Sequence, residues 1–328
     1  MITLFTTAKP FEGKWAVLQR NAIRSWRCLA PDVEIILFGR GGGYEEAAGE
    51  LGITHRPDVA TNEKGIPRVD AMFRDVDRSA RHAIRAYLNC DVILLDDFPR
   101  AAARVPFNRF LMVSQRWDLA IDGPFDFEAA GWSGALRQTA RTSGELQYPG
   151  AIDLFAWRGP VWDQLPPMVV GRGLFDQWLI YDCRRRGVPV VDATDVVTLV
   201  HQAHDYSHID GGKKTVELGE DALRNLELGG GYERMFTVQD ADWRLTRGGM
   251  IRNWYRGDSQ RCREVFLMLH ERCRQPWLVL RAALAELACE WVTRWREARA
   301  GRMAPLLKLP LWLARRAVGA RAKGRSAA

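Results

Sequence analysis

The 328-residue sequence has few cysteines, and none of its six cysteines forms a CxxC pair. Neither a zinc finger nor a disulfide-stapled fold is therefore expected. The sequence also lacks a run of about 18 uncharged apolar residues, which a transmembrane helix would need. Residues 1–7 lack the basic segment and the cleavage site of a signal peptide, and their composition is that of a strand. These absences favour a reducing, cytoplasmic location.

Acidic residues are scarce at the C-terminal end. Residues 296–328 contain nine Lys and Arg residues but only one acidic residue, whereas the rest of the chain is nearly neutral. A near-neutral body does not fit a general nucleic-acid-binding protein, so no nucleic-acid partner is expected. Within the tail, residues 306–316 place Leu and Trp beside clustered Arg, which is typical of a segment held at an anionic membrane. We therefore expect peripheral binding at the inner face of the cell membrane; a solubilising tail is the alternative.

Apolar strands alternate with helical segments over the first hundred residues. The expected order is strand Ile2–Thr7, helix 14–29, strand Val33–Phe38, helix 44–51, helix Arg68–Ala86 and strand Tyr87–Leu95. Such alternation predicts an α/β fold with parallel strands, in which ligands bind at the carboxyl ends of the strands. The body of the protein is expected over residues 1–245, and a helical extension with the basic tail over residues 246–328.

Two polar side chains interrupt the most apolar stretch of the chain. Asn89 and Asp91 lie between the apolar residues Tyr87-Leu88 and Val92–Leu95. With the two-residue period of a strand, both side chains would lie on the same side. A buried carboxylate needs a partner, and a cation at the end of a strand would provide one. The alternative is an Asn/Asp pair that caps a turn.

This stretch resembles the metal-binding strand of GT-A glycosyltransferases, in which Asp-x-Asp stands between two apolar runs. Here Asn89 occupies the first position of that motif. The resemblance implies a Rossmann-related mixed sheet flanked by helices. It also implies a nucleoside-diphosphate sugar donor, and Mn²⁺ or Mg²⁺ held by Asp91 and Asn89. Donor contacts are expected from residues near strand ends, namely Thr6, Thr7, Lys9, Arg68, Asn89 and Asp91.

Two further carboxylates resemble acceptor-side residues of the same family. Asp153 follows a Pro-Gly turn and begins an apolar run, and Asp176 lies in the first turn of an expected helix. The resemblance implies that Asp176, or Asp153 as second choice, deprotonates the hydroxyl of a saccharide or lipid-linked acceptor and so inverts the anomeric centre. Retention of configuration stays open. The alternatives are an ordinary strand start at Asp153 and a helix N-terminal charge at Asp176.

A second polar cluster contains His201, His204 and His208. These three of the chain's six histidines lie within eight residues. Neutral imidazoles bind Mn²⁺ and similar cations. In GT-A enzymes a histidine from a late loop often completes the metal site, which implies this role for His201 or His204. Asp205 and His208 are alternatives for acceptor binding, and a surface loop is the simplest alternative.

Two other functions stay open. A sugar-nucleotide pyrophosphorylase has a related fold but carries a Gly-rich phosphate loop directly after its first strand, where this chain has Thr6-Thr7-Ala8-Lys9. The glycines at 39–43 follow the second strand instead, lack the spacing of known phosphate loops and favour a turn. The other alternative is a non-catalytic binding module at a membrane.

Overall fold

The computed structural model describes residues 1–204 and 219–253, together with residues 284, 287 and 291. The chain divides into two compact units, Met1–Trp254 and Tyr255–Ala328. The boundary expected at residue 245 falls inside the strand Trp243–Thr246, which pairs with the strand Gly249–Arg252. The expected membrane-binding tail lies outside the described residues, and membrane association stays a prediction. Among the described residues, no helix has both the length and the apolar character needed to span a membrane.

The N-terminal half of the first unit consists of parallel strands joined by helices. The strands are β1 (Ile2–Thr7), β2 (Glu34–Phe38), β3 (Thr54–Arg56) and β4 (Ile84–Leu88), in the spatial order β3-β2-β1-β4. The connecting helices are α1 (Gly13–Arg27), α2 (Tyr44–Leu51) and α3 (Val69–Ser79). This arrangement brings the carboxyl ends of β1 and β4 side by side.

The second half makes the sheet mixed, as expected. Strand β8 (Ile152–Arg158) is antiparallel to both β4 and β6 (Phe110–Leu119). Beyond β6, strands β9 (Val190–Asp192) and β11 (Trp243–Thr246) continue in parallel, and β12 (Gly249–Arg252) closes the edge as a hairpin with β11. Helices α6 (Phe175–Arg185) and α8 (Glu220–Gly229) follow β8 and flank the sheet, with short 3₁₀ turns at Tyr232–Arg234 and Val238–Asp240.

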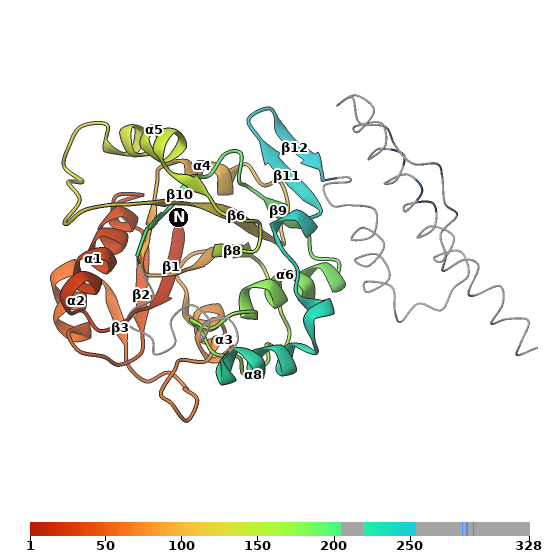
Figure 1. Ribbon diagram of the computed structural model, residues 1–328, viewed down its shortest axis with the longest axis horizontal. Helices are drawn as coiled ribbons and strands as arrows, with labels where there is room; N and C mark the ends of the chain where they lie inside the picture. Colours follow the sequence, from red (N-terminus) through yellow and green to blue (C-terminus); the bar gives the residue numbers. More distant parts are fainter. Residues whose placement is uncertain (205–218, 254–283, 285–286, 288–290, 292–328) are drawn as a thin grey trace, which may run out of the picture. The chain divides into compact units, whose positions relative to one another are not determined.

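Strand β6 takes part in two sheets. Its register with β8 shifts between Val113 and Gln115, and such an irregularity bends a strand. Beyond this point β6 pairs with β10 (Leu199–Gln202) and β7 (Glu145–Leu146), and β10 pairs in turn with β5 (Val92–Leu94). Helices α4 (Asp97–Ala103) and α5 (Trp132–Ser143) lie beside this smaller sheet (Figure 1). The small sheet brings β10 next to the segment that follows β4.

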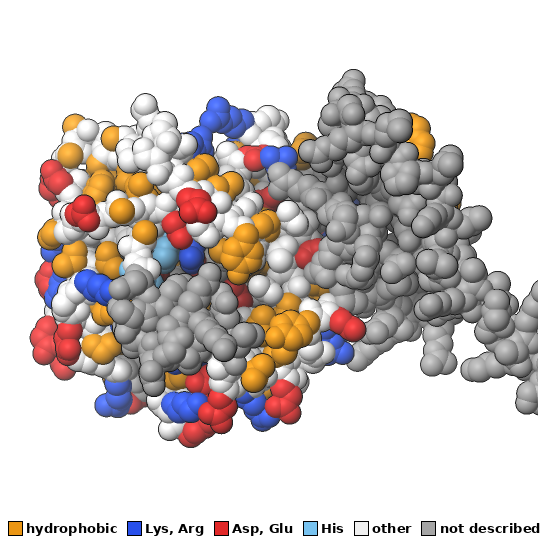
Figure 2. Space-filling view, in the orientation of Figure 1, with side chains coloured by type: hydrophobic (Ala, Val, Ile, Leu, Met, Phe, Trp, Pro, Cys, Tyr) orange, Lys and Arg blue, Asp and Glu red, His pale blue; other side chains and the backbone are white. Residues whose placement is uncertain are grey.

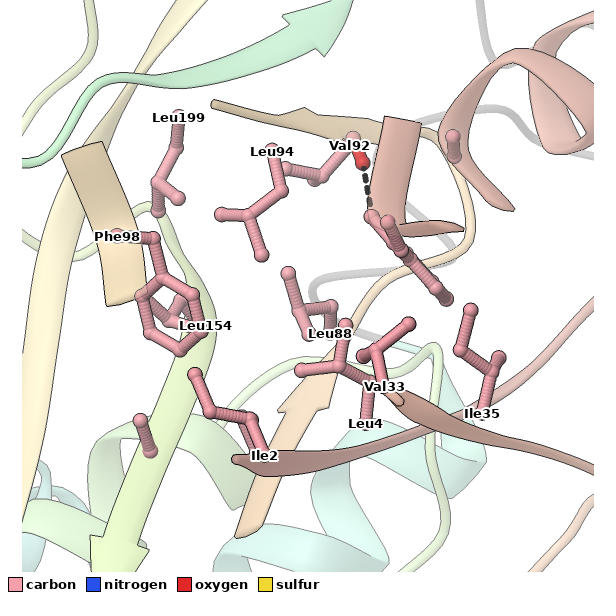
Figure 3. Close-up of a cluster of buried hydrophobic side chains, with 14 of the residues drawn as sticks. Ile2, Leu4, Val33, Ile35, Leu88, Val92, Leu94, Phe98, Leu154 and Leu199 are labelled. Atoms are coloured by element: carbon pink, nitrogen blue, oxygen red, sulfur yellow. Dashed lines mark hydrogen bonds between the residues drawn. The ribbon is translucent and has the colours of Figure 1, made fainter. Parts of the chain in front are cut away.

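Alternate side chains of the central strands pack into two different hydrophobic layers. On one face, Ile2 and Leu4 join Leu88, Val92 and residues of α1, α2 and α4 in a buried cluster (Figure 3). The indole Nε1 of Trp26 donates a hydrogen bond to the Val92 carbonyl, 2.9 Å away, and ties α1 to β5. Each large side chain buried here contributes about 1.5–3 kcal/mol to folding.

The opposite face of the sheet is aromatic. Phe5 makes edge-on contacts with Phe73 of α3, Tyr87 and Trp157, at centroid distances of 5.1–5.7 Å. Phe73 also stacks on Trp157 at 5.1 Å. Such pairs add about 0.5–1.5 kcal/mol each to the hydrophobic gain. Strand β4, which precedes the polar stretch, is therefore fixed from both faces.

The secondary structure differs from the sequence predictions in two places. The helix expected over Arg68–Ala86 ends at Ser79, and the apolar residues after it form β4. The single strand expected over Tyr87–Leu95 is two strands, β4 and β5, with Asn89–Asp91 between them.

Candidate metal centre and active site

The Asn89-Cys90-Asp91 segment is a turn that sends its two polar side chains to different partners. The Val92 amide donates to the Asn89 carbonyl, and the buried Thr6 hydroxyl fixes the start of the turn by donating to the Leu88 carbonyl at 2.7 Å. The expectation that Asn89 and Asp91 share one side of a continuous strand is wrong, because β4 ends before Asn89. The alternative of a polar pair at a turn describes the backbone correctly.

Asp91 lies against the two histidines of the late cluster. Its Oδ2 atom is 3.1 Å from Nε2 of His204 and 3.7 Å from Nε2 of His201. The ligand atoms of these three side chains all lie within 4.8 Å of one another, which makes them a candidate metal site. Pairing of β10 with β5 produces this contact, since His201 lies opposite Val92, the neighbour of Asp91.

His201 is oriented by a second carboxylate. It lies directly across the β10–β6 pair from Asp118, and its Nδ1 is 3.0 Å from Asp118 Oδ1. Although burial opposes protonation, Asp91 and Asp118 raise the pKa of His201 to about 9. Burial by itself would raise the pKa of Asp91, but the two histidines hold it well below its usual value. A cation bound beside Asp91 would replace the proton on Nε2 of His201, while Nδ1 keeps its proton toward Asp118.

The residues present fit a divalent cation. Asp91 Oδ1 is buried, and no described residue donates a hydrogen bond to it. Burying such an oxygen costs free energy unless a cation or a hydrogen-bond donor contacts it. One carboxylate and two imidazoles form a donor set that suits Mn²⁺ and related cations. The pale blue histidine atoms that reach the viewed face in Figure 2 gather in one place, beside blue Lys or Arg atoms.

Asn89 faces a different carboxylate, Asp153 at the start of β8. Asn89 Nδ2 donates to Asp153 Oδ1 at 2.6 Å, and Asn89 Oδ1 accepts from the Tyr87 hydroxyl at 3.1 Å. The other oxygen of Asp153 forms an ion pair with Nη1 of Arg116 at 2.7 Å. Both oxygens of Asp153 are thus engaged, and the residue is only 3% exposed. These contacts fix the positions of Asn89 and Arg116 relative to Asp153.

Arg116 joins the two parts of the site. Its Nε atom is 2.9 Å from Asp118 Oδ1, the same oxygen that faces His201. A continuous chain of contacts therefore runs from His201 through Asp118, Arg116 and Asp153 to Asn89, two residues from Asp91. The apolar run that predicts β6 ends at Ser114, so the sequence pattern did not single out Arg116 and Asp118. A two-residue period continued past Ser114 would have placed both on one side.

Asp176 lies in the first turn of α6, and its pKa is raised to about 7. Burial is the main cause, and the negative charge of Asp153 adds to it, while backbone N–H groups at the start of the helix act in the opposite direction. Its Oδ1 atom is buried, and no described residue donates a hydrogen bond to it. A carboxylate with a pKa near 7 can exchange a proton at neutral pH.

Of the expected donor contacts, Lys9 lies beside the residues that surround Asp91. Its Nζ is 3.2 Å from the centroid of the Trp15 ring, and that ring contacts His204 at a centroid distance of 4.6 Å. Burial lowers the pKa of Lys9 to about 8, although the charge of Asp91 acts in the opposite direction. Lys9 therefore places a positive charge beside the candidate metal site.

The structure gives the other expected donor contacts structural partners. Thr6 is fully buried against the Leu88 carbonyl. Arg68 forms a bidentate ion pair with Asp70, in which Nε donates to Oδ1 at 3.0 Å and Nη2 donates to Oδ2 at 2.8 Å. Thr7 lies beside Gly39, whose φ of +102° favours glycine, and a Cβ atom there would lie 3.3 Å from the Thr7 hydroxyl. Asp205 and His208 lie outside the described residues.

No protein-family model matches this sequence, and no curated protein matches it. Among solved structures, the protein is similar to glucosyl-3-phosphoglycerate synthase from Mycobacterium tuberculosis, a GT-A glycosyltransferase. Its complex with Mn²⁺, UDP and phosphoglyceric acid has 14% sequence identity and a TM-score of 0.41, covering 70% of this chain and 79% of that chain. The complex with Mn²⁺, UDP-glucose and phosphoglyceric acid has 14% identity and a TM-score of 0.40, covering 70% and 80%.

Proposed function

We propose that this protein is a divalent-metal-dependent glycosyltransferase that moves a sugar from a nucleoside-diphosphate sugar to a hydroxyl acceptor with inversion. The observation that carries the proposal is the convergence of Asp91, His201 and His204 at the ends of β4 and β10. A cation with open positions at such a site can bind a diphosphate. The fold supports the proposal, since ligands bind in α/β sheets beyond the carboxyl ends of parallel strands.

Asp91, His201 and His204 would hold Mn²⁺ or Mg²⁺, which when bound offsets the negative charge that develops on the leaving diphosphate. Asp118 keeps His201 oriented with Nε2 toward that position. Lys9 adds a second positive charge near Asp91. Asn89, held by Tyr87 and Asp153, fixes the turn that presents Asp91 and stays a candidate for donor contact.

Asp176 is the residue that would remove the proton from the acceptor hydroxyl. Its raised pKa gives it a proton affinity suited to neutral pH, and its Oδ1 atom is not committed to a described partner. Asp153 is less suited, because both of its oxygens already have partners, Asn89 and Arg116, and neither is left to accept a proton from an acceptor. Asp153 instead fits the role of orienting the acceptor or its neighbours.

Calorimetric titration of Mn²⁺ tests the site directly. We expect one bound ion per chain in the wild type, and no detectable binding in Asp91→Asn or His204→Ala. Asp58→Asn and His82→Ala are matched controls. Asp58 is exposed. His82 contacts the Asp32 carbonyl and lies before the start of β4, whereas Asp91 follows the end of that strand. Equal Mn²⁺ binding by Asp91→Asn would refute the assignment.

A panel of nucleotide sugars that includes UDP-glucose, with and without Mn²⁺, tests the reaction. The proposal predicts metal-dependent release of the nucleoside diphosphate and a rise in Tm with the correct donor. Formation of a nucleoside triphosphate from a nucleotide sugar and pyrophosphate would instead identify a pyrophosphorylase. Absence of any turnover, together with an unchanged Tm for every donor, would support the binding-module alternative.

A further inference from the structure

A polar cavity lies in the first unit, away from the candidate metal centre. It has a volume of about 220 Å³, and its lining residues come from helices α4 and α5, the segment before β10 and the tip of the β11–β12 hairpin. Its lining is dominated by arginine: Arg100, Arg104, Arg137, Arg141 and Arg247 line it, together with Asp97, Ala101, Asp195 and Val196. None of these residues belongs to the candidate metal centre.

The two acidic residues in the lining are already paired. Asp97 Oδ2 accepts from Nε of Arg137 at 3.0 Å and from the Thr198 amide at 3.2 Å. The Asp195 carboxylate pairs with Arg244, which is not part of the lining. Asp96, which is not part of the lining, pairs with Arg100 and Arg137, so the excess of positive charge in the cavity comes from the other three arginines. Asp97 also keeps one buried oxygen, Oδ1, without a described hydrogen-bond donor, and this oxygen opposes anion binding in its immediate vicinity.

Three of the lining arginines have no acidic partner within residues 1–204 and 219–253. Arg104 Nη2 donates to the carbonyls of Thr246 and Arg247 at 2.6 and 3.1 Å, and so fixes the hairpin tip against α4. Arg141 Nη2 approaches the Thr198 hydroxyl at 3.3 Å. No ion pair joins Arg104, Arg141 or Arg247 to a described carboxylate, so their guanidinium charges stay available for an anion. Guanidinium forks match the geometry of phosphate oxygens.

We propose that this cavity, which we name the arginine cavity, is a binding site for a small phosphate anion. The volume decides the class of ligand: pockets for drug-sized molecules span about 300–1,000 Å³, and this one is smaller. Orthophosphate and pyrophosphate fit, and a larger molecule would enter only by its phosphate end. The ligand is held by Arg141 of α5 and Arg247 of the hairpin, with Arg104 holding the hairpin in place.

Thermal unfolding of the full-length chain in EDTA tests the site without a contribution from the metal centre. At ten times its Kd, orthophosphate or pyrophosphate should raise Tm by about 3–6 °C relative to sodium chloride of equal ionic strength. The same measurement is made with UDP as a third ligand. A rise in Tm equal to that with pyrophosphate indicates that the cavity accepts the phosphate end of a nucleotide. An unchanged Tm with UDP indicates a preference for the free anions.

The variants are Arg141→Ala and Arg247→Ala, each expected to weaken phosphate binding about tenfold by calorimetry. Arg141→Lys should lie between wild type and alanine, because it keeps the charge but loses the fork. Arg40→Ala removes an exposed arginine from the loop after β2 and should bind as wild type does. Arg247 has no described side-chain ion pair or hydrogen bond to lose, so its removal should leave folding intact. A Tm shift that persists in both alanine variants, or no shift beyond the chloride control in the wild type, would overturn the proposal.

Discussion

Two carboxylates of the candidate site have opposite environments. Asp91 faces two histidines, which hold its pKa well below the usual value despite burial, whereas Asp176 is buried near Asp153 and has a pKa of about 7. The same side-chain chemistry therefore yields a permanent anion at one place and a proton acceptor at the other. Environments that separate the pKa values of two carboxylates are a sign of different catalytic roles.

Replacing Asp91 should have the largest effect. Asp91→Asn keeps the shape of the side chain but removes the charge that attracts the cation, so we expect turnover to fall by about 1,000-fold or more. Steady-state kinetics at saturating Mn²⁺ measure this. Asp58→Asn, an exposed carboxylate replaced in the same way, should keep full activity. Retention of most activity by Asp91→Asn would place the metal centre elsewhere.

Asp176→Asn should reduce turnover by about 100- to 10,000-fold, the usual contribution of general base catalysis. Because Asp176 does not touch the cation in the proposed mechanism, Mn²⁺ affinity measured by calorimetry should stay as in the wild type. In the wild type, turnover should rise with pH through about 7, as Asp176 loses its proton. A flat profile between pH 6 and 8 would argue against Asp176 as the base.

Asp176→Asn should also change stability in a pH-dependent way. The folded pKa of about 7 lies above the usual 3.8, so the folded protein binds this proton more tightly than the unfolded chain does. The stabilisation from this proton is full below about pH 4 and is lost as pH rises toward 7. Above pH 7 the buried charge costs up to about 4 kcal/mol, and Asn removes that cost. Urea unfolding should show the variant gaining stability over wild type at pH 8 but not at pH 4.

Arg116 links the two environments, and its replacement should have a smaller effect on metal binding. Arg116 contacts Asp118 and Asp153 through two different nitrogens of one planar guanidinium group. In Arg116→Lys the side chain has a single terminal nitrogen and cannot reproduce both contacts. Loss of support for His201 should weaken Mn²⁺ binding about 10-fold, as is common for partners of metal ligands. Calorimetry measures this, and the pH profile of turnover should shift as well, because Asp153 lies near Asp176. A pure loss of stability, with Mn²⁺ affinity and pH profile unchanged, would show that Arg116 is only structural.

Local sequence was sufficient for much of the fold. The apolar, β-branched segments predicted β1 and β2 closely, and the spacing of Trp15, Leu18, Ile23 and Trp26 predicted α1, because these features depend on neighbouring residues alone. The predictions for the end of α3 and for the turn at Asn89–Asp91 are wrong. In both places the residues suit more than one backbone conformation, and pairing with distant strands decides between them.

The sequence by itself determined which groups are candidates for chemistry: a carboxylate after an apolar strand, a late histidine cluster, and a carboxylate at a helix start. Only the tertiary structure decided which groups meet. Asn89 pairs with Asp153 rather than accompanying Asp91, and Asp118 and Arg116 complete the site from β6. The physical reason is that these contacts depend on the register of β8 against β4 and β6 and of β10 against β5 and β6, strands that are far apart along the chain.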